Sequence, residues 1–292
     1  MNLATYFNER GAMVEAALRS AIVSETTPPL LIEAMRYSLE AGGKRLRPIL
    51  AIAGAEAVGG AAANVMSLAV AIEMIHTFSL IHDDLPAMDN DDLRRGRPTN
   101  HKVYGDAMAI LAGDALVVEA FSILARSSYA NPNILLEVMR DVADAAGGKG
   151  MTGGQVQDIK ATGKKITESE LEQLHRMKTG KLITVPVVGG AKLCGASPQQ
   201  VTALQVYGEA LGLAFQIADD ILDIEGSEAE IGKDVGSDID SNKATYPAII
   251  GMSAAKKKAR ACVDQAVSAL AVFDDRADPL RAIAQFVIER RK

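Results

Sequence analysis

Cysteine is scarce in this sequence of 292 residues, which contains only Cys194 and Cys262. The two residues are 68 positions apart, a spacing that matches neither a zinc motif nor the framework of a disulfide-stabilised domain. Free cysteines are typical of a reducing compartment. We therefore expect a cytoplasmic protein whose fold does not depend on cross-links.

An excess of positive charge is also absent. The formal net charge is −6 and the isoelectric point is about 5.4, whereas proteins that bind nucleic acids usually present a net basic face to the phosphates. We expect no nucleic-acid partner. Glu9 and Arg10 precede any long apolar run, so we also expect no signal peptide.

An unbroken apolar run of membrane-spanning length is missing as well. The least charged stretch, residues 49 to 72, is long enough to cross a bilayer. However, it contains Glu56 and Asn64, and its "VGGAAAN" segment is typical of a helix break. This pattern predicts two buried helices joined by a turn, and no membrane contact.

Linkers and strand patterns are not found either. The chain has no Pro/Ser tract, no sustained period-two alternation and no Asn-Gly or Asp-Gly turn, so we expect one domain spanning residues 1–292. Apolar residues recur instead at helical spacing. The segments are 6–23, 30–43, 68–84, 107–128, 168–188, 198–224 and 254–273. They predict an all-α fold, a single large bundle of about ten to thirteen helices.

The stretch "HDDLPAMDNDD" places five aspartates directly behind an apolar run. Asp83 and Asp89 are six positions apart, about 120° out of phase on an ideal helix. They can face one site only if the helix is interrupted between them, and Pro86 stands there. A calcium loop that starts at Asp89 is excluded, because Arg94 and Asn100 occupy its glycine and glutamate positions.

A second apolar helix also runs into paired aspartates, in "FQIADDILD". Asp219 and Asp223 lie one helical turn apart on the same face, where like charges repel. Either cluster alone is compatible with a solvated acidic patch. Because two matched helices carry such clusters, we expect them to face each other and to bind Mg²⁺, which prefers a few carboxylates, water and substrate phosphate.

Cationic segments bracket these acidic motifs. Arginine forks suit bidentate phosphate contacts, and lysines act as point charges. The residues are Lys44, Arg45, Arg47, Arg94, Arg95, Arg97, Lys178, Lys181, Lys233 and Lys243. A chain of net negative charge with such pockets suits a small polyanion that arrives with its own metal, and diphosphate meets both requirements.

These motifs resemble those of the trans-isoprenyl diphosphate synthases, and most closely the short-chain bacterial farnesyl diphosphate synthases. "GGKRLRP", "HDDLPAMDNDDLRRGRPT", "GGQVQD", "KTG", "FQIADDILD", "GKDVGSD" and "KATYP" appear in the order of that family. The resemblance covers about residues 30 to 250. It implies the isoprenoid synthase fold with a central cleft, and a homodimer with one cleft per subunit.

The resemblance also implies the site. The metal ligands would be Asp83, Asp84, Asp89, Asp219 and Asp223, holding three Mg²⁺ ions, for which Mn²⁺ could substitute. The residues implied in catalysis are Asp83, Asp84, Asp89, Asp219, Asp220, Asp223, Lys178 and Lys233. The allylic diphosphate would bind Arg94, Lys178, Thr179, Gln216, Lys233 and Lys243. Isopentenyl diphosphate would bind Lys44, Arg47, His76 and Arg95.

For His76, the residue type alone favours a buried core histidine, and only its place in the motif indicates ligand contact. Mg²⁺ and the cations would neutralise charge as the allylic C–O bond breaks. The isopentenyl double bond would then attack the allylic cation, with diphosphate as the base. We expect the Gly-rich segment 226–244 to close over the site and exclude water.

Product length depends on the depth of the pocket beneath the metals. Phe78 lies five residues before Asp83, about 7.5 Å along the helix axis, whereas Ser79 is nearer the face of Asp83. In the resembling family an aromatic residue at this place accompanies C15 products, which predicts farnesyl diphosphate.

Three alternatives remain. The nearest is a geranylgeranyl (C20) synthase. A terpene cyclase is disfavoured because aromatics are only 4%, tryptophan is absent and the second motif is a plain "DDILD". A non-catalytic synthase subunit would have lost aspartates or basic residues, and the only departure is Asn90.

Four polar residues have open roles. Asp91 and Asp92 could orient Arg94 and Arg95 or be solvated, and we favour orientation. Gln155 and Asp158 could support a metal ligand or a water from behind.

Overall fold

The computed structural model describes residues 1–22, 26–128, 131–225 and 243–289. Lys233 and most of the 226–244 segment therefore lie outside the described residues. The first half contains α1 (Leu3–Ala21), α2 (Pro29–Leu39), α3 (Leu46–Ala57), α4 (Met66–Asp83), α5 (Asn100–Tyr104), α6 (Asp106–Ala125) and α7 (Pro132–Ala146). The second half contains α8 (Met151–Ala161), α9 (Glu168–His175), α10 (Lys181–Leu193), α11 (Pro198–Glu225), α14 (Tyr246–Ile250), α15 (Met252–Ala269) and α16 (Asp278–Glu289).

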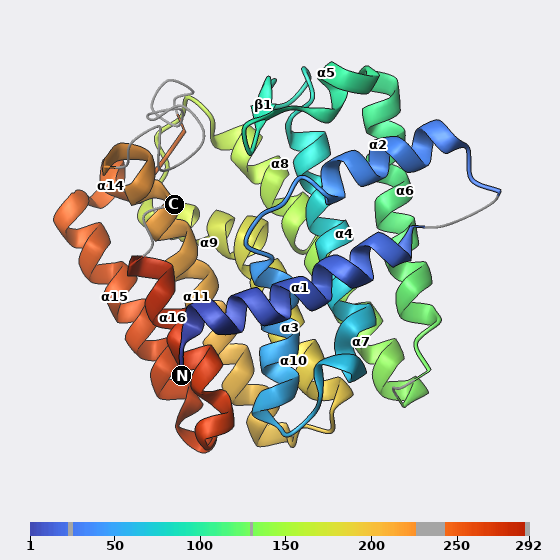
Figure 1. Cartoon of the computed structure of the whole chain (residues 1–292). Coiled ribbons are helices and arrows are strands. Elements are labelled where there is room, and N and C mark those ends of the chain that lie inside the picture. Colours follow the sequence, from blue (N-terminus) through green and yellow to red (C-terminus); the bar gives the residue numbers. More distant parts are fainter. Residues whose placement is uncertain (23–25, 129–130, 226–242, 290–292) are drawn as a thin grey trace.

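The predicted all-α class is confirmed. Among the described residues, twelve α-helices have eight residues or more, within the predicted range, and α5 and α14 have five each. The predicted break after residue 57 is also confirmed, because α3 ends at Ala57 and a short 3-10 turn, Ala62–Val65, precedes α4. Figure 1 shows α1 crossing in front of α3 and α4, with which it packs.

One small hairpin interrupts the helices, and the sequence pattern did not predict it. Strands β1 (Leu93–Arg94) and β2 (Arg97–Pro98) pair antiparallel around a turn at Arg95 and Gly96. Both turn residues have positive φ, 55° and 73°, which is the backbone of a tight hairpin turn. Glycine suits the second position, but arginine at the first replaces the usual Asn or Asp, so the turn signal was not recognised.

Residues 168–188, predicted as one helix, are divided by a π-helical turn. This π turn, Arg176–Gly180, lies between α9 and α10 and contains the "KTG" sequence. Such turns insert one extra residue per hydrogen-bonded ring and occur frequently at functional sites. Helical periodicity cannot reveal the extra residue, since apolar residues continue on both sides.

The core helices approach one another closely. A Cβ atom on Gly54 of α3 would lie 2.1 Å from the carbonyl oxygen of Val187 in α10, and one on Gly190 of α10 would lie 2.1 Å from that of Ala51. Glycine and alanine therefore set the spacing between α3 and α10, which carry side chains of both large core clusters.

Two helices among the described residues are long and apolar enough to cross a membrane by length and composition alone. The stretch Ala62–Asp83, which contains α4, has a mean hydropathy of 1.5 and is 61% buried within the protein. Helix α6 has a mean hydropathy of 1.9 but is only 33% buried. The first is therefore a core helix, whereas the second leaves apolar residues exposed.

The glycine contacts predict that alanine substitutions at two glycines have different effects on stability. We expect Gly54→Ala to lower the free energy of unfolding by about 1–3 kcal/mol, because the added methyl group overlaps a backbone carbonyl that cannot move alone. Gly11→Ala in α1 is the control, because a Cβ there meets nothing within 4 Å, and we expect equal or higher stability. Urea denaturation measures both, and equal effects would contradict the packing argument.

Candidate active site

The first aspartate motif begins where α4 ends. Asp83 is the last residue of α4, and the backbone N–H of Asp89 donates to the carbonyl of Asp83 at 2.9 Å. The chain therefore turns back on itself after Asp84, with Pro86 in the turn. This confirms the predicted interruption, and it brings Asp83 and Asp89 together although they are out of phase on a continuous helix.

The hairpin adds a cation to this motif. The Nε of Arg94 donates to Asp84 at 2.9 Å, and its Nη2 contacts Asp91 at 3.1 Å. Asp91 thus orients Arg94, as predicted. The same prediction is wrong for Asp92, which forms an exposed ion pair with Lys102 at 2.7 Å. The sequence could not separate these neighbours because the turn, not the spacing, decides which carboxylate faces Arg94.

The carboxyl group of Asp83 has a strongly shifted pKa. The pKa of its carboxyl is raised to about 6, because burial and the nearby Asp89 and Asp84 raise it by more than Lys178 and Arg94 lower it. The positive charge of Lys178 is thus close enough to act on Asp83. A cation placed beside this carboxylate would relieve the penalty of its ionised form.

The π turn connects the two motifs. The Nζ of Lys178 lies 2.5 Å from the carboxylate of Asp158 in α8, and the hydroxyl of Thr179 donates to the side-chain carbonyl of Gln216 in α11 at 2.9 Å. Asp158 therefore supports a cation, rather than the metal ligand or water that the sequence suggested. Lys178 is partly buried, and a Cβ on Gly154 would come within 2.3 Å of its backbone nitrogen.

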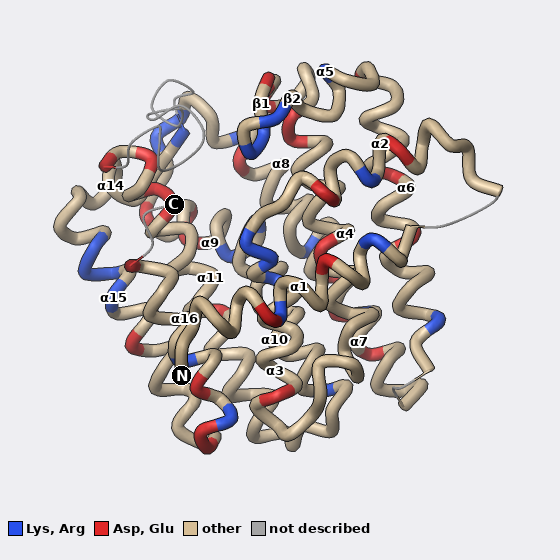
Figure 2. Tube along the Cα trace, in the orientation of Figure 1, with Lys and Arg blue, Asp and Glu red and all other residues tan. Residues whose placement is uncertain are grey.

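A second connection comes from the segment before α14. The Nζ of Lys243 lies 3.6 Å from the carboxylate of Asp89, so a residue that follows α11 in the chain reaches the first motif. Together with the π turn, this contact places the two aspartate motifs on the same side of the molecule. Figure 2 shows basic and acidic segments side by side around the β1–β2 hairpin.

The three aspartates of the second motif differ in exposure. Asp220 and Asp223 are buried, with 2% and 5% of their surface exposed, whereas Asp219 is partly exposed. All three stand near the end of α11, within about two turns after Gln216. Asp220 accepts hydrogen bonds from Gln216 within α11 and from the backbone N–H of Tyr246, and it faces His175 of α9, as described below.

Two of the residues expected to bind isopentenyl diphosphate, Arg47 and His76, lie at the start of α3 and on α4. The Nη1 of Arg47 donates to the Nε2 of His76 at 3.2 Å. Because arginine can only donate, Nε2 has no proton, and the remaining N–H of a neutral ring is on Nδ1. Burial and the charges of Arg47 and Arg95 hold the pKa of His76 well below its usual value, so the ring is neutral at pH 7.

Lys44 and Arg95 complete this group. The Nζ of Lys44 lies 5.4 Å above the ring of Phe286 in α16. The guanidinium of Arg95 donates to the carbonyl of Gly42, and a Cβ on Gly43 would lie 2.6 Å from its central carbon. Gly43 of "GGKRLRP" therefore leaves the space that the arginine of the hairpin fills, and Gly42 supplies the carbonyl that it bonds.

Arg45, counted in the sequence among the phosphate-facing cations, has another role. It is only 4% exposed and forms ion pairs with Glu73 and Glu15, each at 2.6 Å. Its backbone is left-handed, with φ of 50°, a conformation that is uncommon for residues other than glycine. A buried ion pair explains this arginine, and the expectation of phosphate contact is wrong for it.

Phe78, the predicted floor of the substrate pocket, packs edge-on against His82 one turn later, with ring centroids 5.2 Å apart. The Nε2 of His82 lies 3.1 Å from the carbonyl oxygen of Ile110 in α6, and a Cβ on Gly113 of α6 would lie 2.2 Å from the same nitrogen. Phe78 is thus supported from α6. The hydroxyl of Ser79 instead donates to the carbonyl of His76 at 2.8 Å.

No three Asp, Glu, His or Cys side chains within the described ranges converge closely enough to hold a metal ion by themselves. The donor set still fits Mg²⁺, because this ion is usually held by one or two carboxylates together with water and substrate phosphates. Asp83 and Asp89 supply hard oxygen ligands, and a cation bound beside Asp83 would favour the ionised form that burial disfavours. The residues are therefore compatible with metal that arrives with a diphosphate.

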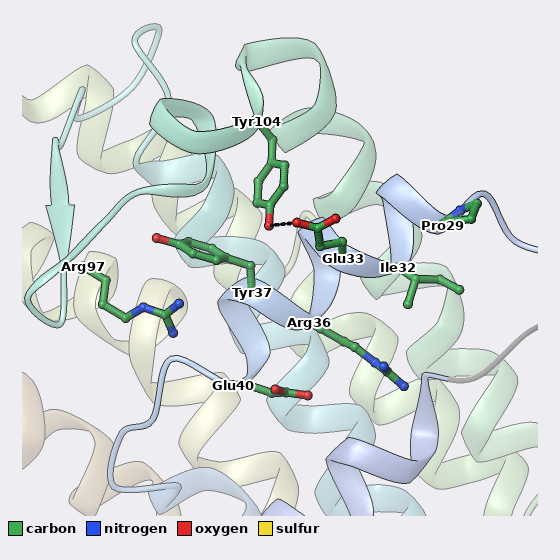
Figure 3. A pocket seen from close by; sticks show the side chains of 8 residues that line it. All are labelled: Pro29, Ile32, Glu33, Arg36, Tyr37, Glu40, Arg97 and Tyr104. Carbon is green, nitrogen blue, oxygen red and sulfur yellow. Dashed lines mark hydrogen bonds between the residues drawn. The ribbon is translucent and has the colours of Figure 1, made fainter.

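A separate cavity of about 490 Å³ lies on the outer side of α2 (Figure 3). Its lining residues are Pro29, Ile32, Glu33, Arg36, Tyr37, Glu40, Arg97 and Tyr104. Arg97 lies 4.4 Å above the ring of Tyr37, so this predicted cation stacks on an aromatic face. The lining includes none of the predicted metal ligands, and we assign the active site from the motifs instead.

An α-helical bundle in which two aspartate motifs meet lysines and arginines is the arrangement of a prenyltransferase acting on diphosphates. A family model described as polyprenyl synthetase matches residues 28–278. The chain belongs to the polyprenyl synthetase family.

Two relatives and one solved structure illustrate the similarity. A farnesyl diphosphate synthase of Geobacillus stearothermophilus is 51% identical over 260 residues, covering 88% of each chain. A geranylgeranyl diphosphate synthase of Cyanophora paradoxa is 45% identical over 291 residues, covering 99% of this chain and 97% of the relative. The geranylgeranyl pyrophosphate synthetase structure from Pyrococcus horikoshii Ot3 has a TM-score of 0.90 at 31% identity, covering 99% and 98%.

The raised pKa of Asp83 predicts a pH-dependent effect on stability. In the folded protein the carboxyl group of Asp83 keeps its proton up to about pH 6, whereas in the unfolded chain it loses the proton near pH 4. Above pH 6 the group is ionised in both states, and its ionised form destabilises the fold. We expect Asp83→Asn to raise the Tm of the metal-free protein by about 2–4 °C at pH 8, and not at pH 4.

Scanning calorimetry at both pH values, with a chelator present, measures this difference. Asp144→Asn is the matched control, because Asp144 is exposed and pairs only with Lys149 among the described residues. An equal gain in Tm at both pH values would contradict the conclusion that the ionised carboxylate of Asp83 destabilises the fold.

Proposed function

We propose that this prenyltransferase condenses isopentenyl diphosphate head to tail with dimethylallyl or geranyl diphosphate, giving (2E,6E)-farnesyl diphosphate and diphosphate. The observation that supports this most is the link between the motifs. Lys178 acts on Asp83, the adjacent Thr179 bonds Gln216, and Lys243 reaches Asp89. Acidic and basic groups thus alternate around one site, as a metal-bound diphosphate requires.

The proposed cofactor is Mg²⁺, three ions per site, with Mn²⁺ as a substitute. The proposed ligands are Asp83, Asp84, Asp89, Asp219 and Asp223. When bound, the ions would withdraw charge from the diphosphate as the C–O bond breaks. Lysines 178 and 243 and Arg94 would hold the same diphosphate, and Lys233, outside the described residues, is proposed to join them.

The second substrate is proposed to bind Lys44, Arg47, His76 and Arg95. A neutral His76 whose Nε2 accepts from Arg47 can donate its Nδ1 proton to a phosphate oxygen. Held there, the isopentenyl double bond can attack the allylic cation. The released diphosphate then accepts the proton, so the chain needs no basic side chain at that step.

A product of fifteen carbons is proposed from Phe78. The similar proteins include both farnesyl and geranylgeranyl diphosphate synthases, so relatives do not select between C15 and C20. Phe78 packs against His82, which in turn lies beside the carbonyl of Ile110. A ring supported in this way resists displacement by a growing chain, which favours the shorter product.

The direct test incubates the protein with Mg²⁺, isopentenyl diphosphate and geranyl diphosphate, and then separates the dephosphorylated products. We expect farnesol from the unaltered chain and a shift to C20 or longer products from Phe78→Ala, with turnover reduced less than about tenfold. Chelation should abolish turnover, and added Mg²⁺ should restore it.

Phe273→Ala is the control, since this residue packs in the second core cluster, which contains no residue of α4 or α6. A wild-type product of C20 would favour the geranylgeranyl alternative, and a cyclic hydrocarbon would favour a cyclase. No release of diphosphate would favour a non-catalytic subunit. If Phe78→Ala still stops at C15, Phe78 is not the floor.

We also propose one cytoplasmic domain that works as a homodimer, with α6 at the interface. Ile110, Leu111 and Val118 of α6 are 43%, 53% and 68% exposed, and Leu136 of α7 is 67% exposed. Exposed apolar residues gathered on one helix are typical of a protein interface. A second copy of this chain is the proposed partner, rather than a membrane.

The interface is tested by Val118→Glu. We expect the wild-type protein to elute at about twice the monomer mass of 30.8 kDa and the variant to dissociate, because a carboxylate would be buried without a partner. Light scattering after size exclusion measures both masses. Val272→Glu, at a residue 46% exposed outside α6, should leave the dimer intact. A wild-type monomer, or wild-type protein recovered with membranes, would contradict the proposal.

A further inference from the structure

We infer that Asp220 is a positioning residue, a buried carboxylate that assembles the groups holding the allylic diphosphate and does not itself touch metal or substrate. This inference rests on the proposed function and deepens it. It also replaces the expectation that Asp219, Asp220 and Asp223 of the second motif all take a direct part in catalysis. The evidence is the set of contacts that the carboxylate of Asp220 makes.

Both oxygens of Asp220 are occupied by protein donors. One oxygen accepts from the side-chain amide of Gln216 at 3.1 Å, and the other accepts from the backbone N–H of Tyr246 at 2.9 Å and faces the Nε2 of His175 at 3.4 Å. Only 2% of its surface is exposed, so these contacts are shielded from solvent. A buried carboxylate requires such donors.

The direction of Asp220 also differs from that of its neighbours. On an ideal helix Asp219 and Asp223 lie about 40° apart, whereas Asp220 is rotated by about 100° from Asp219. The first two can share a face toward a metal, and Asp220 is turned toward the protein interior. The contacts above show what it meets there.

Each donor belongs to a segment that carries a proposed diphosphate ligand. Gln216, held through its amide nitrogen, presents its carbonyl oxygen to the hydroxyl of Thr179. His175 is the last residue of α9, directly before the π turn that contains Lys178 and Thr179. Asp220 thus holds the π turn at two points.

The third donor anchors the segment that returns toward the first motif. Tyr246 begins α14, and Lys243, three residues earlier, reaches the carboxylate of Asp89 at 3.6 Å. Fixing the backbone N–H of Tyr246 therefore limits where Lys243 can lie. Helices α9, α11 and α14 pack against one another (Figure 1), so one side chain of α11 can bond the other two.

The pair His175 and Asp220 has no motif signal in the sequence, because its partners are 45 residues apart. A carboxylate can only accept, so the Nε2 of His175 carries the proton in this contact. The ring of His175 also lies near that of Tyr246, with centroids 5.7 Å apart. The histidine is thus enclosed by the two residues whose positions it helps to set.

The experiment compares Asp220→Asn with Asp219→Asn. Asparagine keeps the size of the side chain but replaces one acceptor by a donor, which then faces the donors of Gln216 or Tyr246. We expect Asp220→Asn to raise the KM for geranyl diphosphate about 10- to 100-fold. The Mg²⁺ concentration for half-maximal rate and the KM for isopentenyl diphosphate should stay within about twofold of wild type.

Asp219→Asn is expected to behave differently, by raising the Mg²⁺ requirement. Calorimetry with inorganic diphosphate and Mg²⁺ provides a readout that does not depend on turnover, and Asp220→Asn should weaken this binding. His175→Phe should show the same signature more weakly, and His175→Gln, which keeps a donor, should restore allylic binding. These variants decide the question if Asp220→Asn does not fold.

Three results would overturn the inference. A Mg²⁺ requirement raised by Asp220→Asn as much as by Asp219→Asn would show that Asp220 acts on the metal. Unchanged kinetics in Asp220→Asn, or wild-type kinetics in His175→Phe, would show that the contacts do not position the site. Absence of any turnover in the wild-type protein would instead contradict the proposed function.

Discussion

Repulsion between carboxylates held close together is the constraint on which this site depends. The pKa of Asp83 is raised to about 6 because burial and neighbouring aspartates disfavour its charge. Arg94 of the hairpin and Lys178 of the π turn offset part of this effect. The remaining unfavourable free energy must be offset by packing elsewhere in the protein. The same excess of negative charge favours binding of a cation that comes with the substrate.

The rest of the fold provides that packing. Helices α3 and α10 meet through glycines whose missing side chains allow backbones to touch. Such contacts leave little freedom for one helix to shift against the other. A rigid frame of this kind is needed when charged groups of equal sign are kept in place, since any movement that separated them would lower the electrostatic energy.

The elements that could be predicted from the sequence are those with local signals. Helical periodicity predicted the all-α fold, and the phase difference between Asp83 and Asp89 predicted the interruption at Pro86. The π turn was missed because an inserted residue leaves the apolar pattern intact. The hairpin was missed because Arg95 adopts positive φ without the usual Asn or Asp.

Side-chain partners far apart in the chain could not be predicted at all. Arg45, Arg47 and Lys44 look alike in the sequence, yet only the structure shows that Arg45 is buried against Glu73. Asp220 likewise resembles Asp219 until its three donors are visible. In both cases burial separates residues of the same chemistry, and burial is decided by tertiary packing rather than by local sequence.

The contact between His82 and Gly113 links the proposed product-length residue to the outer surface of the molecule. One methyl group on Gly113 would press on His82, which supports Phe78. Substitutions in α6 could therefore change the product length indirectly, without contacting the growing chain. Since the same helix is the proposed dimer interface, relatives that differ in how their subunits associate could also differ in what they make.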